Sequence, residues 1–214
     1  MATPSLHRPA SRVAHSSSSA LLDRPEGTSP ASITLVTDTT DGHPVGALAL
    51  VGLRLALGFL FLWAFLDKTF GLGYATPSAK AWIHGGSPTK GFLSGANVGP
   101  LQGVFRSLAK LEPGMDWLFM IGLLGIGVAL LLGVALRPAA ASGALLVMMM
   151  WFAVWPPATV GGGQPTSSTN PIIDEHILEA LALIVVAAFA GKTAGYLGGR
   201  WANLGVVRRF PWLR

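Results

Sequence analysis

The stretch Leu53–Lys68 reads LRLALGFLFLWAFLDK, an apolar run broken by a single charge, Arg54, before it ends at Asp67 and Lys68. The apolar character extends back to Val45, so residues 45–66 are long enough for a helix to cross the roughly 30 Å of hydrocarbon in a bilayer. Three further segments of this kind occupy residues 117–136, 138–155 and 171–190. We therefore predict an all-α integral membrane protein, an antiparallel four-helix bundle with a structured outer loop.

The composition supports a membrane protein. The 214 residues are 51% hydrophobic and only 12% charged, about half the charged share of an average soluble domain. The chain has no cysteine, which excludes disulfides, iron–sulfur clusters and thiolate zinc sites. In such a protein the net charge of +5 indicates topology signals and contact with membrane lipid, and we expect no nucleic-acid partner.

The rest of the chain divides around these spans. Residues 1–44 are polar and rich in Ser, Thr and Pro, which predicts a disordered cytoplasmic tail before a transmembrane domain at residues 45–191. The outer loop covers residues 67–116 and contains an apolar pattern at residues 101–111 that predicts an amphipathic surface helix. Residues 192–214 are expected to form a basic cytoplasmic tail.

The distribution of Lys and Arg predicts the orientation. With the N-terminus inside, nine of these residues fall in inner segments and five in outer segments, and Arg54 is intramembrane. The positive-inside rule then places both termini in the cytoplasm, which we take to be that of a bacterium, with the protein in the cytoplasmic membrane.

Ionisable residues inside predicted spans are the main candidates for a site, because a charge in hydrocarbon is costly unless it is paired or hydrated. From their similar depths, we predict that Arg54 of the first span pairs with Glu179 of the fourth. Further charged residues are expected to cluster above this pair, giving an anion-binding or proton-relay group: Asp67, Lys68, Asp174, Glu175 and His176. A purely structural role is the alternative, with an ion pair fixing helix register and Asp174 capping a helix.

The predicted spans also contain residue types that bind haem, metal ions or quinone. His176 is the only histidine in a predicted span, so we predict neither haem nor a bound metal ion. The aromatic and thioether side chains of Trp63, Met148 and Trp151 are candidates for contact with a quinone ring, although interfacial tryptophans and packing methionines have the same character.

Three motifs resemble the DoxX/DoxD family of membrane proteins. They are Leu53–Lys68, the loop Ala81–Leu93 (AWIHGGSPTKGFL), and Asn170–His176 (NPIIDEH), which is similar to the Asn-Pro-x-x-Asp-x-His signature of the family. With four spans in the same order, the resemblance covers about residues 45–200.

The resemblance implies a function. The DoxD branch is associated with thiosulfate:quinone oxidoreductase, which oxidises thiosulfate to tetrathionate, passes electrons to membrane quinone and works with a DoxA-type partner subunit. On this hypothesis quinone is a substrate, and the anion docks near Lys68 and three further residues of the basic outer loop, Lys80, His84 and Lys90. A non-catalytic anchor or assembly subunit, a small anion transporter, another redox partner and a homo-oligomer remain open alternatives.

Overall fold

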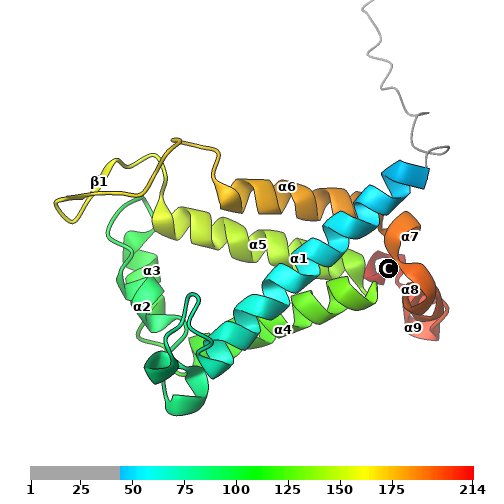
Figure 1. Cartoon of the computed structure of the whole chain (residues 1–214), viewed down its shortest axis with the longest axis horizontal. Coiled ribbons are helices and arrows are strands. Elements are labelled where there is room, and N and C mark those ends of the chain that lie inside the picture. Colours follow the sequence, from blue (N-terminus) through cyan, green and yellow to red (C-terminus); the bar gives the residue numbers. More distant parts are fainter. Residues whose placement is uncertain (1–43) are drawn as a thin grey trace, which may run out of the picture. The chain divides into compact units, whose positions relative to one another are not determined.

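The computed structural model describes residues 44–214, so the tail predicted for residues 1–43 lies outside the described residues. The main elements of the described part are four long helices, α1 (Pro44–Phe70), α4 (Gly114–Leu132), α5 (Leu136–Val154) and α6 (Glu175–Ala188) (Figure 1). Helices α1, α4 and α5 are long and apolar enough to cross a membrane, which agrees with the helical membrane protein predicted from the sequence.

Helix α6 is shorter than the span predicted at residues 171–190. Its 14 residues extend about 21 Å, less than the hydrocarbon thickness. The Asn170 side chain accepts hydrogen bonds from the amides of Ile172 and Ile173, both at 2.9 Å, which holds this segment in a turn. At the other end, Phe189 separates α6 from the short helix α7 (Ala190–Thr193). A fourth membrane-spanning helix therefore stays a prediction.

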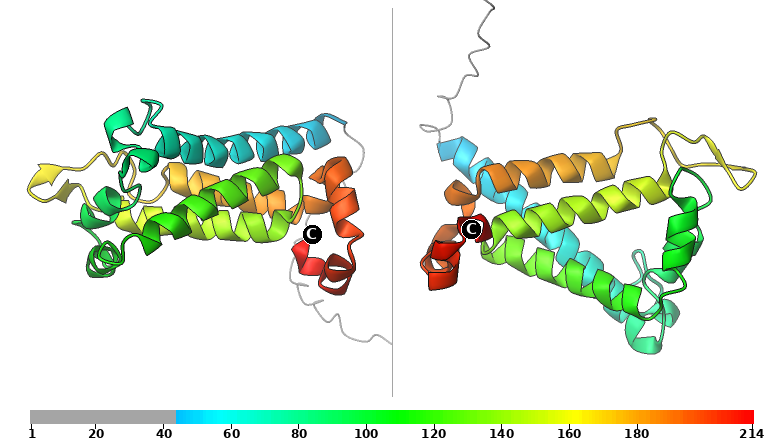
Figure 2. Two further views of the ribbon diagram at one scale, coloured as in Figure 1. Left: turned by 90° about the horizontal axis from the view of Figure 1, so that it is seen from below. Right: turned by 180° about the vertical axis from the view of Figure 1, so that it is seen from behind.

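The long helices pack in two close pairs, α1 with α4 and α5 with α6, and the turn between α4 and α5 joins the pairs (Figure 2). Glycine permits the close α1–α4 approach: a Cβ atom on Gly127 would lie 2.7 Å from the backbone nitrogen of Leu62. The core between the helices is apolar, and its most deeply buried members include Phe61, Met120, Leu130, Leu183 and Val186.

One end of the helices carries the predicted outer loop. It contains two 3₁₀ turns, η1 (Ser78–Lys80) and η2 (Trp82–His84), and two short helices, α2 (Lys90–Ser94) and α3 (Gln102–Leu108). Helix α3 lies within the predicted amphipathic segment and buries Phe105, whereas Val104 and Leu111 are more than half exposed. A small hairpin follows α5, with strands β1 (Val160–Gly161) and β2 (Gln164–Pro165). We call residues 67–116 and 155–176 the loop end.

The opposite end carries the C-terminal residues, which fold into helices. After α7 come α8 (Gly195–Ala202), α9 (Gly205–Arg209) and the 3₁₀ turn η3 (Pro211–Leu213). We call residues 189–214 the collar, since they pack beside the start of α1 and the turn between α4 and α5 (Figure 1). The end of the long helices against which they pack is the collar end. The basic tail expected for residues 192–214 is therefore a folded part of the protein.

Candidate functional site

The most suggestive polar group lies at the start of α6. Asp174 is the N-cap residue of this helix, and its Oδ1 accepts a hydrogen bond of 3.2 Å from the amide of Ile177. Its other oxygen, Oδ2, accepts a hydrogen bond of 2.8 Å from Nδ1 of His176, whose side chain is buried. Because Nδ1 is engaged in this way, the imidazole is held in one orientation and Nε2 is left to exchange a proton.

Glu175 and Glu179 accompany this pair on α6. Glu175 is exposed, and Glu179 is half-buried one turn further along the helix. Potential ligand atoms of Asp174, Glu175 and His176 lie within 4.8 Å of one another, so the group has the spacing of a cation site. The direct hydrogen bond between His176 Nδ1 and Asp174 Oδ2 nevertheless occupies one potential metal-ligand atom of each residue. This arrangement favours acid–base chemistry over cation binding.

An aromatic cluster on α5 lies beside this group. The indole nitrogen of Trp151 donates a hydrogen bond of 3.0 Å to the carbonyl of Ile172, two residues before Asp174. The ring centroid of Trp151 is 5.2 Å from that of Phe152 and 5.3 Å from that of Trp155. These rings offer flat apolar surface close to the Asp174–His176 pair.

A cavity of about 360 Å³ lies at the same end of α5, and its wall is formed by residues other than the aromatic cluster and the Asp174–His176 pair. Its wall includes Ala153 and Val154 of α5, Phe92 and Ala96 of the outer loop, and Pro165 of the hairpin. This volume lies within the usual range for small-molecule sites.

The residues predicted to contact quinone are divided between two places. Trp151 lies in the α5 cluster, and Met148, one turn earlier on α5, packs against the main core. Trp63 is on α1, where its ring stacks with Phe59 and meets Tyr74 edge-on at 5.2 Å. Of the three, Trp151 has the direct link to the segment that leads into α6.

The predicted Arg54–Glu179 pair is wrong. Nη1 of Arg54 donates hydrogen bonds to the carbonyls of Leu130 and Leu131, in the last turn of α4, and its Nε has no partner. The ion pair at the start of α6 joins His176 to Asp174 and does not include Glu179. The physical reason is that the last carbonyls of a helix lack intrahelical donors and attract a cation, so Arg54 caps α4.

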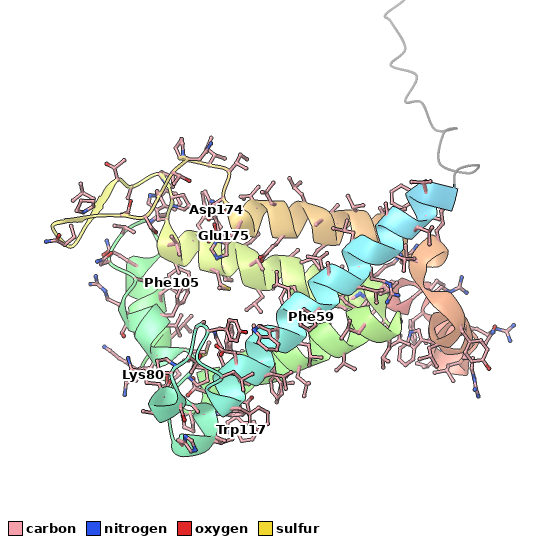
Figure 3. All side chains as sticks on the ribbon, in the orientation of Figure 1. Phe59, Lys80, Phe105, Trp117, Asp174 and Glu175 are labelled. Carbon is pink, nitrogen blue, oxygen red and sulfur yellow. The ribbon has the colours of Figure 1, made fainter. Side chains whose placement is uncertain are left out.

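The single charged cluster expected above that pair is also divided. The carboxylate of Asp67 is buried and accepts hydrogen bonds from the amides of Tyr74 and Ala75, at 3.2 and 3.0 Å, so it fastens the loop that follows α1. Helices α1 and α6 diverge toward the loop end, which separates Asp67 and Lys68 from the start of α6 (Figures 1 and 2). Figure 3 shows Lys80 beside the end of α1 and Asp174 and Glu175 at the start of α6.

Two of the lysines predicted to bind an anion come together. Lys68 and Lys80 line a second cavity, of about 160 Å³, together with Thr76 and Ser87. His84 is exposed and its Nδ1 donates to the carbonyl of Ser78 at 2.8 Å, and Lys90 is exposed at the start of α2. Neither of these two residues lines the cavity.

Sequence reasoning missed a network behind this cavity. Oδ1 of Asp116 accepts hydrogen bonds from the amide and hydroxyl of Thr89, at 3.0 and 2.8 Å, and lies 2.9 Å from the hydroxyl of Ser87. That hydroxyl also lies 2.8 Å from both carboxylate oxygens of Glu112. The available signal was an acid in the first turn of an apolar helix, a position where a carboxylate attracts backbone donors.

No family model, no curated protein and no solved structure matches this chain. The resemblance to the DoxX/DoxD family thus stays a prediction from the three sequence motifs.

Proposed function

We propose that the protein is the membrane subunit of a quinone-linked oxidoreductase and that His176, oriented by Asp174, transfers protons to the quinone. The observation that carries this proposal is the partly buried Asp174–His176 hydrogen bond at the start of α6, next to the aromatic cluster of α5. An imidazole hydrogen-bonded to a carboxylate through Nδ1 is a common arrangement for general acid–base catalysis.

The chemistry requires a proton donor. Reduction of a quinone to a quinol adds two electrons and two protons, one proton at each oxygen. His176 donates a proton from Nε2 and regains one from solvent, while Asp174 stabilises the imidazolium form. We propose that the quinone ring occupies the cavity at the same end of α5, whose wall combines apolar side chains such as Phe92 and Val154 with the polar side chains of Asn97 and Thr166.

Thiosulfate is our proposed electron source, following the family resemblance. Two thiosulfate ions join through a new S–S bond to form tetrathionate and release the two electrons that the quinone takes up. The cavity between Lys68 and Lys80 provides two cationic side chains for a small dianion. Because the chain contains no cysteine, we propose that a separate redox partner carries the electrons between the two substrates.

The orientation follows from charge. The collar and the start of α5 carry six cations and no acidic residue, whereas the loop end carries both signs. We propose that the collar end faces the cytoplasm of a bacterial cell and the loop end faces outward, with α6 and α7 together completing a fourth span.

The test is thiosulfate-dependent reduction of a soluble quinone by the protein purified in mild detergent with its associated partners. We expect His176→Gln to lower kcat by about 100-fold or more, the usual size of a general acid–base contribution. Asp174→Asn keeps a good N-cap residue but removes the carboxylate that orients His176, so it should lower kcat with little change in thermal stability. A solvent deuterium isotope effect on the wild-type rate that is lost in His176→Gln would report the proton transfer.

His84→Gln is the matched control, since it removes the other histidine of the described residues at an exposed position outside both cavities. Wild-type activity in His176→Gln would overturn the role of the pair. Absence of activity in the wild type, with quinone and partners present, would overturn the thiosulfate assignment.

A non-catalytic anchor subunit is the second candidate, and one observation favours it. Arg54 and Asp67, both expected in the site, bind backbone groups and so have structural roles. For an anchor, His176→Gln would change partner retention during purification and leave the partner's own activity intact.

A further inference from the structure

The collar is a folded cap on the ends of three long helices. Gly198 of α8 packs directly on the carbonyl of Gly133, so that a Cβ atom at residue 198 would collide with it. The amide of Arg137 donates to the carbonyl of Arg214 at 2.9 Å, and the indole nitrogen of Trp201 donates to the carbonyl of Leu213 at 2.8 Å. The first two contacts hold the collar against the turn after α4 and the start of α5, and the third joins α8 to η3 within the collar.

The charge of the collar has one sign. From residue 180 to residue 214 the sequence contains no Asp or Glu, whereas the collar and the neighbouring α5 start carry six cations: Arg137, Lys192, Arg200, Arg208, Arg209 and Arg214. In Figure 3 side chains that end in nitrogen project from the surface of α8 and α9. The collar is thus a concentrated cationic surface.

Aromatic and aliphatic side chains are interleaved with these cations. The Arg200 guanidinium lies 5.9 Å from the ring centroid of Tyr196, and the Arg209 guanidinium lies 5.8 Å from that of Phe210. Tyr196 is 77% exposed and Trp212 is 59% exposed. Amphipathic aromatic rings next to Arg and Lys are typical of segments that lie at the headgroup level of a bilayer.

We propose that the collar binds anionic phospholipid headgroups at the surface of the membrane that the long helices cross. The collar lies at the ends of α1, α4 and α5, the three helices long and apolar enough to be spans, so its cations are placed at the level of the headgroups. Its charge complements a negatively charged lipid surface, and its exposed apolar side chains can enter the boundary between headgroups and acyl chains. A soluble polyanion would use the charge and leave this apolar surface in water.

The experiment compares two spin-labelled lipids around the full chain, reconstituted in vesicles of phosphatidylcholine with one-fifth phosphatidylglycerol. Electron spin resonance gives the association of spin-labelled phosphatidylglycerol with the protein relative to spin-labelled phosphatidylcholine. We expect a several-fold preference for phosphatidylglycerol that falls as sodium chloride is raised from 0.05 to 0.5 M, because salt screens exposed charges.

Three variants locate the effect. Arg200→Gln/Arg208→Gln/Arg209→Gln should bring the preference close to onefold, and the matching triple Arg→Lys variant should keep it, because charge is retained. Lys90→Gln/Arg106→Gln/Lys110→Gln removes the same number of cations from the loop end and should leave the preference unchanged. Equal helicity by circular dichroism shows that each variant is folded.

An unchanged preference in the triple Gln variant would overturn the proposal, as would equal losses in the collar and loop-end variants. Heparin, a soluble polyanion, tests whether the collar binds a soluble ligand and not a lipid surface. If the protein in vesicles of phosphatidylcholine alone binds heparin through the collar arginines but shows no preference for phosphatidylglycerol, the collar is a surface for a soluble polyanion and the proposal is wrong.

Discussion

At the loop end, carboxylates accept the hydrogen bonds that hold the structure together, whereas at the collar end backbone carbonyls do so. Asp67, Asp116 and Asp174 each accept from at least one backbone amide at the loop end. At the collar end, Arg54, Arg137 and Trp201 donate to main-chain carbonyls. Five acids and five cations share the loop end, whereas the collar and the start of α5 contain six cations and no acid.

The difference shows how one chain makes two chemically distinct ends from the same helices. At the loop end, Asp174 caps the first amides of α6, and Asp116 in the first turn of α4 accepts from Thr89 of the loop. At the collar end, the last carbonyls of α4 attract Arg54. The loop end, which carries both acidic and basic side chains, is suited to transferring protons and binding small anions. The cationic collar end is complementary to a negatively charged surface.

The largest expected effect tests the carboxylate side of this comparison. Asp116→Ala removes a buried acceptor of three hydrogen bonds and leaves the amide of Thr89 without a partner. We expect the free energy of unfolding to fall by about 3 kcal/mol or more. Denaturant titration in detergent micelles measures it. Glu175→Ala removes an exposed acid and should cost under about 1 kcal/mol; equal losses in the two variants would refute the comparison.

The next effect concerns how the collar is attached. Gly198→Ala places a methyl group against the carbonyl of Gly133, whereas nothing lies within 4 Å of a Cβ atom at Gly199. We expect Gly198→Ala to destabilise collar docking by about 2 kcal/mol and Gly199→Ala to have little effect on docking. Limited trypsin digestion measures docking through the rate of cleavage after Arg200, and similar rates in both variants would show that this contact does not hold the collar.

A smaller effect concerns the N-cap of α6 at the loop end. Asp174→Ala removes the N-cap of α6 and should lower the free energy of unfolding by about 1 kcal/mol. Asp174→Asn should leave it nearly unchanged, because Asn is also a favourable N-cap residue. Thermal unfolding followed by circular dichroism distinguishes these outcomes, and a large loss in Asp174→Asn would mean that the bond to His176 stabilises the fold.

The smallest effect concerns the carbonyl acceptors of the collar. Trp201→Phe keeps an aromatic ring but removes the indole hydrogen bond to Leu213. We expect a loss of about 0.5 kcal/mol, the low end for a single neutral hydrogen bond. The same trypsin assay should detect faster cleavage near Arg208, and wild-type kinetics would show that η3 is held by other contacts.

The sequence was most informative where structure depends on neighbouring residues. Apolar runs predicted the long helices, and the spacing of Asp174 and His176 at a helix start indicated the group that the structure brings together. It was least informative where a partner is a backbone carbonyl, because every residue has one. Glu179 was therefore the only visible partner for Arg54, although Leu130 and Leu131 hold it. The separation of Asp67 from Asp174 depends on the angle between α1 and α6, which no local pattern specifies.

The position of Arg54 also has a consequence for biosynthesis. Its acceptors, Leu130 and Leu131, lie 76 and 77 residues further along the chain. At elongation rates of about 5–20 residues per second, the ribosome needs roughly 4 to 15 s to make this stretch after Arg54. Throughout that interval α1 contains an arginine whose acceptors have not been synthesised. The apolar residues around it must therefore retain α1 in the membrane until α4 arrives, which makes the pairing of α1 with α4 a late step in the assembly of the nascent chain.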